Sequence, residues 1–194
     1  MQIRTDDRVF ICGKTGCGKT TFVKHSLLTG YPRIIFWDIK KQNSDWPHSI
    51  VCIDPAQLGL AIQQAHRYIL YQPRDISGDD FNQVCRIVYD TGNIALYVDE
   101  VAYVTTGSYI EQWHKMLLIM GRSRGIGVIT GTQRPRHVSN FCISESEHFF
   151  IGKLNLEDDI KKISVVLAKE YHGMPLRMEK YHWIYTDTEN TVVI

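Results

Sequence analysis

The amino-terminal part of the sequence contains a phosphate-binding loop. Residues 13–20 have the pattern G-x-x-x-x-G-K-T, in which glycines let successive backbone N–H groups point inward at a phosphate. The preceding residues 8–12 are apolar and predict a buried strand, and residues 20–28 predict a helix that ends near Gly30. Because strand, glycine loop and helix occur in the order that the motif needs, we expect a nucleotide site rather than a chance glycine-rich turn.

The residues of this loop have expected roles. Lys19 is expected to reach the β- and γ-phosphates of ATP, and the Thr20 hydroxyl to bind Mg²⁺. The amino terminus of the helix adds the positive end of its dipole. The residues expected to contact the phosphates are Gly13, Lys14, Thr15, Gly16, Cys17, Gly18, Lys19, Thr20 and Thr21.

A second signal is the segment 94–100, an apolar strand that ends in two adjacent carboxylates, Asp99 and Glu100. Open α/β sheets place their ligands at the carboxyl ends of their strands. Asp99 is therefore predicted to hold Mg²⁺, and Glu100 to orient and deprotonate the attacking water. An acidic surface pair is the alternative, but the phosphate-binding loop makes it the weaker one. The distance along the chain from Lys19 to Asp99 leaves room for at least one further strand, which favours the additional-strand glutamate branch of P-loop proteins.

Length and composition limit the possible architectures. The 194 residues suit one domain, and we expect a motor core over about 8–152 with a carboxyl-terminal helix and hairpin over 153–194. A formal net charge of +1 means that any nucleic-acid surface must gather its basic residues locally. Five scattered cysteines without a C-x-x-C pair argue against a disulfide framework or zinc knuckle and favour a reducing, intracellular setting. We expect no signal peptide and no membrane-spanning segment.

The rest of the chain alternates between strand and helix patterns. Ser108 and Glu111 have the spacing of a capping box and predict a helix with an apolar stripe at Ile110, Trp113, Leu117 and Met120, ending at Gly121. Asn155 is expected to cap a helix over 157–167. Other strands are expected at 33–38, 49–53, 67–71, 126–130 and 149–152, other helices at 58–65 and 78–89, and a closing hairpin from 181–185 and 191–194.

Gln133 follows the strand over 126–130 and is placed to act as a sensor. At the edge of the active sheet its amide can bond the γ-phosphate or the attacking water and so report hydrolysis. With the phosphate loop, the strand ending in Asp99 and Glu100, and the basic turn 122–127, the segment Gly131-Thr132-Gln133-Arg134-Pro135 completes a set of motifs. This set resembles the FtsK/HerA superfamily of DNA-pumping ATPases over about residues 9–151. That family usually has alanine where this chain has Gly131, and the Gln-Arg-Pro is the most specific part of the resemblance.

The resemblance implies an α/β fold: a RecA-like three-layer sandwich with a central, mostly parallel sheet. The compact size is similar to the genome-packaging ATPases of membrane-containing icosahedral viruses, including the turreted viruses of archaea. The resemblance implies a homohexameric ring around non-specifically bound double-stranded DNA. This ring would dock on a capsid vertex or membrane protein in the host cytoplasm during assembly. An arginine from the neighbouring subunit would stabilise the transferring phosphoryl group, worth ~10³–10⁵ in rate.

Arg122 and Arg124 are the candidates for this arginine, since they precede a strand beside the sheet edge. Arg134 and Arg136 are expected to contact phosphate or DNA instead. Lys40 and Lys41, in a loop at a strand end, are candidates for the DNA channel, with a solvated loop as the alternative. The sequence does not choose among the arginines.

Three other functions fit parts of the sequence. A small P-loop kinase has the right size, but a glutamate directly after Asp99 suits the activation of water, which a kinase must exclude. A scaffold that binds ATP only to assemble has no need of Glu100. A helicase or plasmid-transfer pump of the same superfamily shares every motif and stays the nearest alternative. The stoichiometry of the ring, the direction of pumping and the choice between ATP and other nucleotides are not encoded in these motifs.

Overall fold

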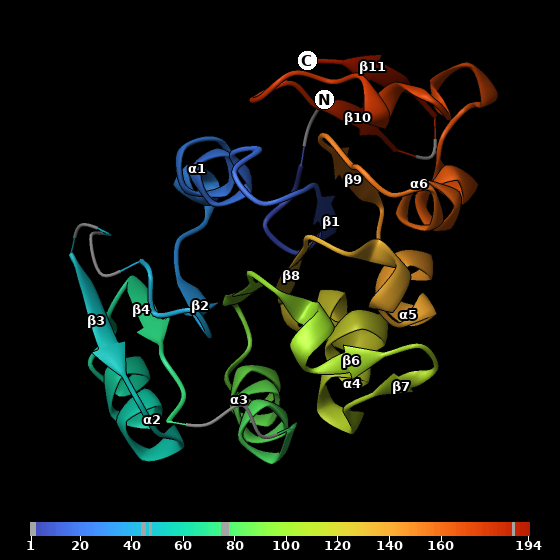
Figure 1. The fold of residues 1–194 in the computed structure, drawn as a ribbon. Helices are drawn as coiled ribbons and strands as arrows, with labels where there is room; N and C mark the ends of the chain where they lie inside the picture. The colour runs from blue at the N-terminus through green and yellow to red at the C-terminus, as the bar shows by residue number, and fades with distance from the viewer. Residues whose placement is uncertain (1–2, 44–45, 47, 75–77, 188) are drawn as a thin grey trace.

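A single mixed sheet organises the molecule (Figure 1). The computed structural model describes residues 3–43, 46, 48–74, 78–187 and 189–194. Nine strands form the sheet in the order β11-β10-β9-β1-β8-β5-β2-β4-β3, and all pairings are parallel except β9–β10 and β10–β11. The strands are β1 (Arg8–Cys12), β2 (Ile34–Trp37), β3 (Ser49–Cys52), β4 (Tyr68–Tyr71), β5 (Ala95–Val98), β8 (Gly127–Thr132), β9 (His148–Ile151), β10 (Ile184–Thr186) and β11 (Thr191–Val193).

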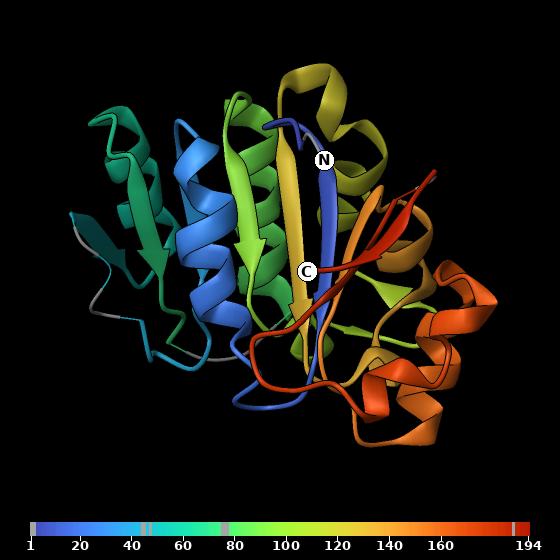
Figure 2. The same cartoon turned by 90° about the horizontal axis from the view of Figure 1, so that it is seen from above.

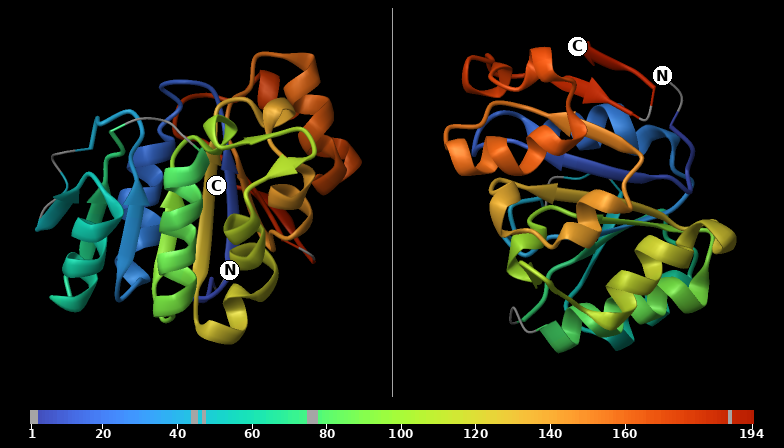
Figure 3. Two further views of the ribbon diagram at one scale, coloured as in Figure 1. Left: turned by 90° about the horizontal axis from the view of Figure 1, so that it is seen from below. Right: turned by 90° about the vertical axis from the view of Figure 1, so that its right-hand side faces the viewer.

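Helices cover both faces of this sheet. One face is covered by α1 (Lys19–Phe22), which continues as π-helical turns over Val23–Leu27 and a 3-10 turn over Leu28–Gly30. Figure 2 shows α1 in front of the sheet, and Figure 3 (left) shows α2 and α3 in front of the opposite face. The helices of that second face are α2 (Pro55–Gln63), α3 (Gly78–Thr91), α4 (Gln112–Met120), α5 (Asn140–Ser144) and α6 (Glu157–Ile163).

Successive side chains of the buried strands point to opposite faces of the sheet and so form two hydrophobic clusters, one under the helices of each face. In β1, Val9 and Ile11 pack in the hydrophobic cluster under α1, whereas Phe10 and Cys12 pack in the cluster under the opposite helices. All four side chains are fully buried, as expected for a parallel strand with both faces covered. The predicted three-layer sandwich around a mostly parallel sheet is therefore confirmed.

The strand order brings the sequence motifs together. β8 lies between β1 and β5, with Cys12 opposite Thr132 and Val98 opposite Thr130. The phosphate-binding loop after β1, the carboxylates after β5 and the segment after β8 therefore leave three neighbouring strands at the same edge. In Figure 2 these strands point downward, and their following loops gather at the lower edge of the sheet.

The predicted capping box is wrong. Instead of a helix from Ser108, a small antiparallel hairpin forms from β6 (Thr105–Thr106) and β7 (Tyr109–Ile110), and α4 begins only at Gln112. The Glu111 carboxylate accepts a hydrogen bond from the Tyr109 hydroxyl at 2.5 Å, so it is engaged with that side chain rather than with the Ser108 backbone.

The buried face of α4 differs from the predicted stripe. It consists of His114, Leu117 and Leu118, while Met120 is 45% exposed. The helix does end at Gly121, as expected.

The predicted cap at Asn155 is also wrong. α6 begins at Glu157 after Leu156, with no side-chain cap. It ends at Ile163 and is followed by a 3-10 turn over Ser164–Val166. Its acidic first turn is confirmed. The predicted closing hairpin forms as β10 and β11, with Thr188 of its turn outside the described residues. No helix in the described part of the chain has the length and hydropathy to cross a bilayer.

Candidate active site

The loop between β1 and α1 wraps around a lysine. Gly16 and Gly18 have φ angles of +78° and +101°, a region that glycine enters at no steric cost. Lys19 is only 6% exposed, and its Nζ donates to the Gly13 carbonyl oxygen at 2.6 Å. The ammonium group therefore lies inside the loop whose backbone amides form the phosphate cradle.

A cavity of about 330 Å³ opens against this loop. Six of the nine predicted phosphate contacts line it: Thr15, Gly16, Gly18, Lys19, Thr20 and Thr21. The remaining three, Gly13, Lys14 and Cys17, form the base of the loop. There the Lys14 N–H donates to the Lys153 carbonyl at 2.7 Å, and Cys17 is 3% exposed. The predicted loop residues thus divide into a cavity-lining group and a supporting group.

Asp99 and Thr20 lie side by side at one wall of this cavity. The Thr20 hydroxyl donates to Asp99 Oδ1 at 3.2 Å, and the Tyr97 hydroxyl donates to the same oxygen at 2.6 Å. Burial, followed by the Asp99 charge, raises the pKa of Tyr97 well above its ordinary value, so this phenol stays a donor. A hydroxyl and a carboxylate side by side are hard oxygen ligands of the kind Mg²⁺ takes. The predicted pair therefore fits a magnesium ion.

Glu100 is surrounded by hydrogen-bond donors. Its Oε1 accepts from the Thr132 hydroxyl at 2.8 Å and from the Gln133 backbone N–H at 3.0 Å. Its Oε2 lies 3.4 Å from Lys40 Nζ, which is also 3.7 Å from Asp99 Oδ2. Glu100 is 5% exposed, so β5 and β8 together fix a nearly buried carboxylate beside the cavity.

Gln133 joins the phosphate loop to Glu100. Its side-chain Oε1 accepts from the Thr15 hydroxyl at 2.5 Å, while its backbone N–H bonds Glu100. Gln133 also lines the cavity. Gln133 thus contacts the phosphate loop through its side chain and Glu100 through its backbone, and its role as a sensor of the bound phosphate stays a prediction.

Sequence reasoning missed Tyr181, which lies against the phosphate loop. Its N–H donates to the Cys17 carbonyl at 3.2 Å, and a Cβ added at Gly18 would lie 2.4 Å from the Tyr181 ring. Tyr181 has a φ of +68°, and both it and Lys180 line the cavity. Nothing local in the sequence marks this contact, because it joins residues at opposite ends of the chain.

The candidate arginines lie at the opposite edge of the sheet. Arg122 and Arg124 precede Gly127, the first residue of β8, which pairs with the first residue of β5. Arg122 donates to Asp7 at 2.8 Å and to Glu147 at 2.7 Å. The Arg124 guanidinium lies 4.7 Å from the centre of the Tyr89 ring. Neither lines the nucleotide cavity of its own chain, so a catalytic role in a neighbouring subunit stays a prediction.

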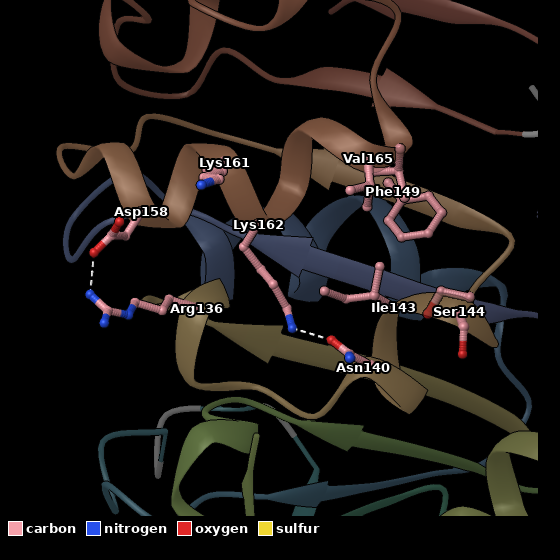
Figure 4. A pocket seen from close by; sticks show the side chains of 11 residues that line it. Arg136, Asn140, Ile143, Ser144, Phe149, Asp158, Lys161, Lys162 and Val165 are labelled. Atoms are coloured by element: carbon pink, nitrogen blue, oxygen red, sulfur yellow. Dashed lines mark hydrogen bonds and ion pairs between the residues drawn. The ribbon is translucent and has the colours of Figure 1, made fainter. Parts of the chain in front are cut away.

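Arg134 and Arg136 are held by α6. The Arg134 Nε donates to Asp159 at 2.9 Å, and Arg136 forms an ion pair with Asp158, which Figure 4 shows. The Arg136 backbone N–H also donates to Asp159 at 3.0 Å. The acidic first turn of α6 thus anchors the segment that follows Gln133.

A larger pocket of about 730 Å³ lies between α5 and α6. Ile143, Phe149 and Val165 give it an apolar lining, and Lys161 and Lys162 contribute charge (Figure 4). Among the described residues it shares none of its lining with the nucleotide cavity. This pocket, which the sequence did not predict, is therefore separate from the candidate active site.

Comparisons with known proteins agree with this geometry. No family model matches the chain. The chain is 27% identical over 188 residues to the DNA packaging ATPase P9 of Enterobacteria phage PRD1, covering 93% of this chain and 82% of that protein. The two proteins are therefore homologous.

Solved structures show the same fold. The genome packaging NTPase B204 of Sulfolobus turreted icosahedral virus 2, in complex with ATP-gammaS, superposes with a TM-score of 0.81 at 17% identity, over 99% of this chain and 97% of that one. The pCW3 conjugation coupling protein TcpA gives a TM-score of 0.66 at 16% identity, over all of this chain and 61% of TcpA. The chain thus has the fold of these NTPases, which is the fold expected from its motifs.

Proposed function

We propose that the chain is an ATPase that translocates double-stranded DNA into a viral capsid. The observation that carries this proposal is the position of Glu100, which follows β5 and accepts a hydrogen bond from the backbone N–H of Gln133, a residue that lines the nucleotide cavity. A carboxylate fixed there suits a general base for water. Homology to the DNA packaging ATPase P9 supports the packaging role, and the ATP-gammaS complex of B204 supports ATP as the nucleotide.

Each residue of the site has a role in this hydrolysis. The amides of the phosphate loop and Lys19 bind the β- and γ-phosphates, where they stabilise charge that develops on the transferring group. Thr20 and Asp99 would hold Mg²⁺, which neutralises phosphate charge when bound. Glu100 orients the attacking water and accepts its proton, and Gln133 contacts the γ-phosphate or that water. Supported from β1, β5 and β8, these groups are positioned before the substrate arrives.

A ring of subunits would supply an arginine to the nucleotide cavity. No arginine lines the nucleotide cavity among the residues that the structure describes. Phosphoryl transfer gains ~10³–10⁵ in rate from such an arginine, which a neighbouring subunit in a homohexamer would supply. Arg122 and Arg124 are the proposed donors. The ring would encircle DNA without sequence preference and dock on a capsid vertex or a membrane protein of the virion during assembly.

One experiment tests the activity and the assignment of Glu100. Phosphate release from ATP is measured with and without long double-stranded DNA, for the wild type, Glu100→Gln and the control Glu170→Gln. We expect DNA to stimulate the wild type and the control, and Glu100→Gln to lose about 10²–10⁴-fold in rate while still binding a fluorescent ATP analogue.

Two outcomes would contradict the proposal. Hydrolysis that does not respond to DNA would remove the motor function and leave only the nucleotide site. Transfer of phosphate from ATP to a nucleoside monophosphate would support a kinase instead. A plasmid-transfer pump, the function closest to that of the structural neighbour TcpA, would pass this assay and is separated by testing for assembly with viral capsids.

A further inference from the structure

Lys40 lines three neighbouring cavities of the molecule. It lines the nucleotide cavity and also two adjoining grooves, each of about 410 Å³, at the carboxyl edge of the sheet. Tyr103 lines both grooves and is 56% exposed. The two grooves thus form one continuous surface, here called the edge groove, whose lining includes Lys40, Lys41, Arg74, Tyr103, Arg134 and His137.

The edge groove carries an excess of basic side chains. Arg74 is 70% exposed and lies 3.5 Å from Asp54, and Arg134 is paired with Asp159. Among the described residues, Lys41 has no acidic partner, and Lys40 is paired only with Asp99 and Glu100. Basic side chains with an exposed tyrosine between them suit a nucleic-acid backbone, whose phosphates provide the opposite charge.

The contact between Lys40 and Glu100 involves one oxygen of the proposed general base. Both Glu100 oxygens have a donor: Thr132 and the Gln133 N–H at Oε1, and Lys40 at Oε2. Oε1 already accepts two hydrogen bonds, so a water that is to lose a proton to Glu100 approaches Oε2, where it competes with Lys40. Thr132 is fully buried and the Gln133 amide belongs to the backbone, so Lys40, with a side chain that is 25% exposed, is the donor that can leave.

We propose that the edge groove binds the phosphate backbone of double-stranded DNA and that Lys40 exchanges its contact with Glu100 for a DNA phosphate. Without DNA, Lys40 occupies Oε2 of Glu100 and slows hydrolysis. With DNA, a phosphate competes for the mobile ammonium group, and Oε2 becomes available to the attacking water. This inference rests on the proposed translocase function and adds to it the DNA-contacting surface and its coupling to the catalytic carboxylate.

The test uses Lys40→Ala, with the exposed Lys169→Ala as matched control. Phosphate release is measured with and without a 60-bp duplex (a length of about six helical turns), and affinity is measured by anisotropy of the same duplex with a fluorescent label. Lys40→Ala is expected to raise hydrolysis without DNA by about two- to fivefold, the range for one partly exposed ion pair. Its further stimulation by DNA is expected to disappear, while Lys169→Ala behaves as the wild type.

DNA binding provides a readout that does not depend on hydrolysis. Lys40→Ala and Lys41→Ala should each weaken DNA binding and reduce the salt dependence of the affinity by about one unit of slope. Lys40→Arg keeps a cation in place and can bond both a carboxylate and a phosphate in a bidentate manner. We expect it to retain DNA affinity and to hydrolyse ATP more slowly than the wild type without DNA, opposite in sign to Lys40→Ala.

The outcomes separate this inference from the proposed function. If DNA does not stimulate the wild type, the translocase function fails. If DNA stimulates the wild type and Lys40→Ala to the same extent, or if Lys40→Ala loses hydrolysis without DNA, only the role of Lys40 is overturned. Unchanged DNA affinity and salt dependence in both Lys40→Ala and Lys41→Ala would overturn the edge groove as the DNA surface.

Discussion

The two edges of the sheet both carry buried charges, but these charges are used in different ways. At the amino edge, Asp7 is 4% exposed and contacts Arg122 at 2.8 Å and His148 at 3.1 Å. Glu147 accepts from Arg122 and Arg8. These charges form a closed network in which each carboxylate contacts at least one basic group.

At the carboxyl edge the charges face a cavity. Lys19 bonds only backbone carbonyls among the described residues, and the contacts of Lys40 with Asp99 and Glu100 are 3.4 Å or longer. The same residue types therefore stabilise the fold at one edge and remain available to a ligand at the other. The charges at the amino edge neutralise one another, whereas those at the carboxyl edge face a cavity that can hold a ligand.

The largest expected effect is at the carboxyl edge, from Lys19→Ala. Removing a donor that faces the phosphates should lower the rate of ATP hydrolysis by about 10²–10³-fold. The free energy of unfolding should change by no more than about 1.5–3 kcal/mol, since the lost bonds run from a charged ammonium group to backbone carbonyls. Phosphate release and urea denaturation of the same samples measure both quantities. A large loss of stability with hydrolysis intact would mean that Lys19 is structural.

Arg122→Ala tests the amino edge. Breaking this network leaves the nearly buried Asp7 without one cationic partner, and we expect a loss of about 1–3 kcal/mol in the free energy of unfolding. Arg86→Ala is the control, because the side chains of Arg86 and Asp90 are both more than 60% exposed and their pair should contribute less than about 0.5 kcal/mol. Urea denaturation measures both variants.

The same variant also tests the proposed role of Arg122 in a neighbouring site. If Arg122→Ala keeps its stability but loses hydrolysis in the assembled ring, the arginine acts on a neighbouring subunit and the amino edge is not purely structural. Loss of stability with residual hydrolysis in the folded fraction would favour the closed network described above.

The parts of the site that depend on local sequence could be predicted. The phosphate loop is fixed by eight consecutive residues between a strand and a helix, and Asp99 and Glu100 follow directly from the end of an apolar strand. Parallel strands place such ends at one edge, so Gln133 could also be placed there. Most helices and strands have the predicted type because their hydrophobic patterns are long enough to be distinctive.

The parts that depend on tertiary contacts could not be predicted. Ser108 and Glu111 match a capping box locally, but Glu111 instead bonds the Tyr109 hydroxyl and a hairpin precedes α4. Tyr181 reaches the phosphate loop only because β10 pairs with β9, beside β1. The contact between Lys40 and Glu100 joins loops after different strands, and no spacing in the sequence encodes such a distance.

Tyr181→Ala tests whether the nucleotide site at the carboxyl edge includes a residue from the last part of the chain. The ring packs against Gly18 and lines the cavity, so removing it should loosen the phosphate loop and weaken binding of a fluorescent ATP analogue by about 3- to 10-fold, as for loss of one partly exposed aromatic contact. Tyr181→Phe keeps the ring and should bind like the wild type. Equal affinities in all three proteins would exclude Tyr181 from the site.

The smallest expected effect is a pH dependence at the amino edge. Burial alone raises the pKa of Asp7, but hydrogen bonds from the Arg4 N–H and His148, with the charges of His148 and Arg122, outweigh it and hold the pKa below its ordinary value of 3.8. A carboxyl group with a lowered pKa contributes stability that is present above pH 3.8 and lost as the pH falls through the lower, folded value.

The measurement compares wild type and Asp7→Asn by urea denaturation between neutral pH and pH 3. The difference in their free energies of unfolding should be largest well above pH 3.8 and should shrink as the pH falls toward 3. The exposed Asp90→Asn should show no such change. If the difference between wild type and Asp7→Asn instead stayed constant down to pH 3, the closed network would not hold Asp7 in its charged form, and the contrast between the two edges would rest on Arg122 alone.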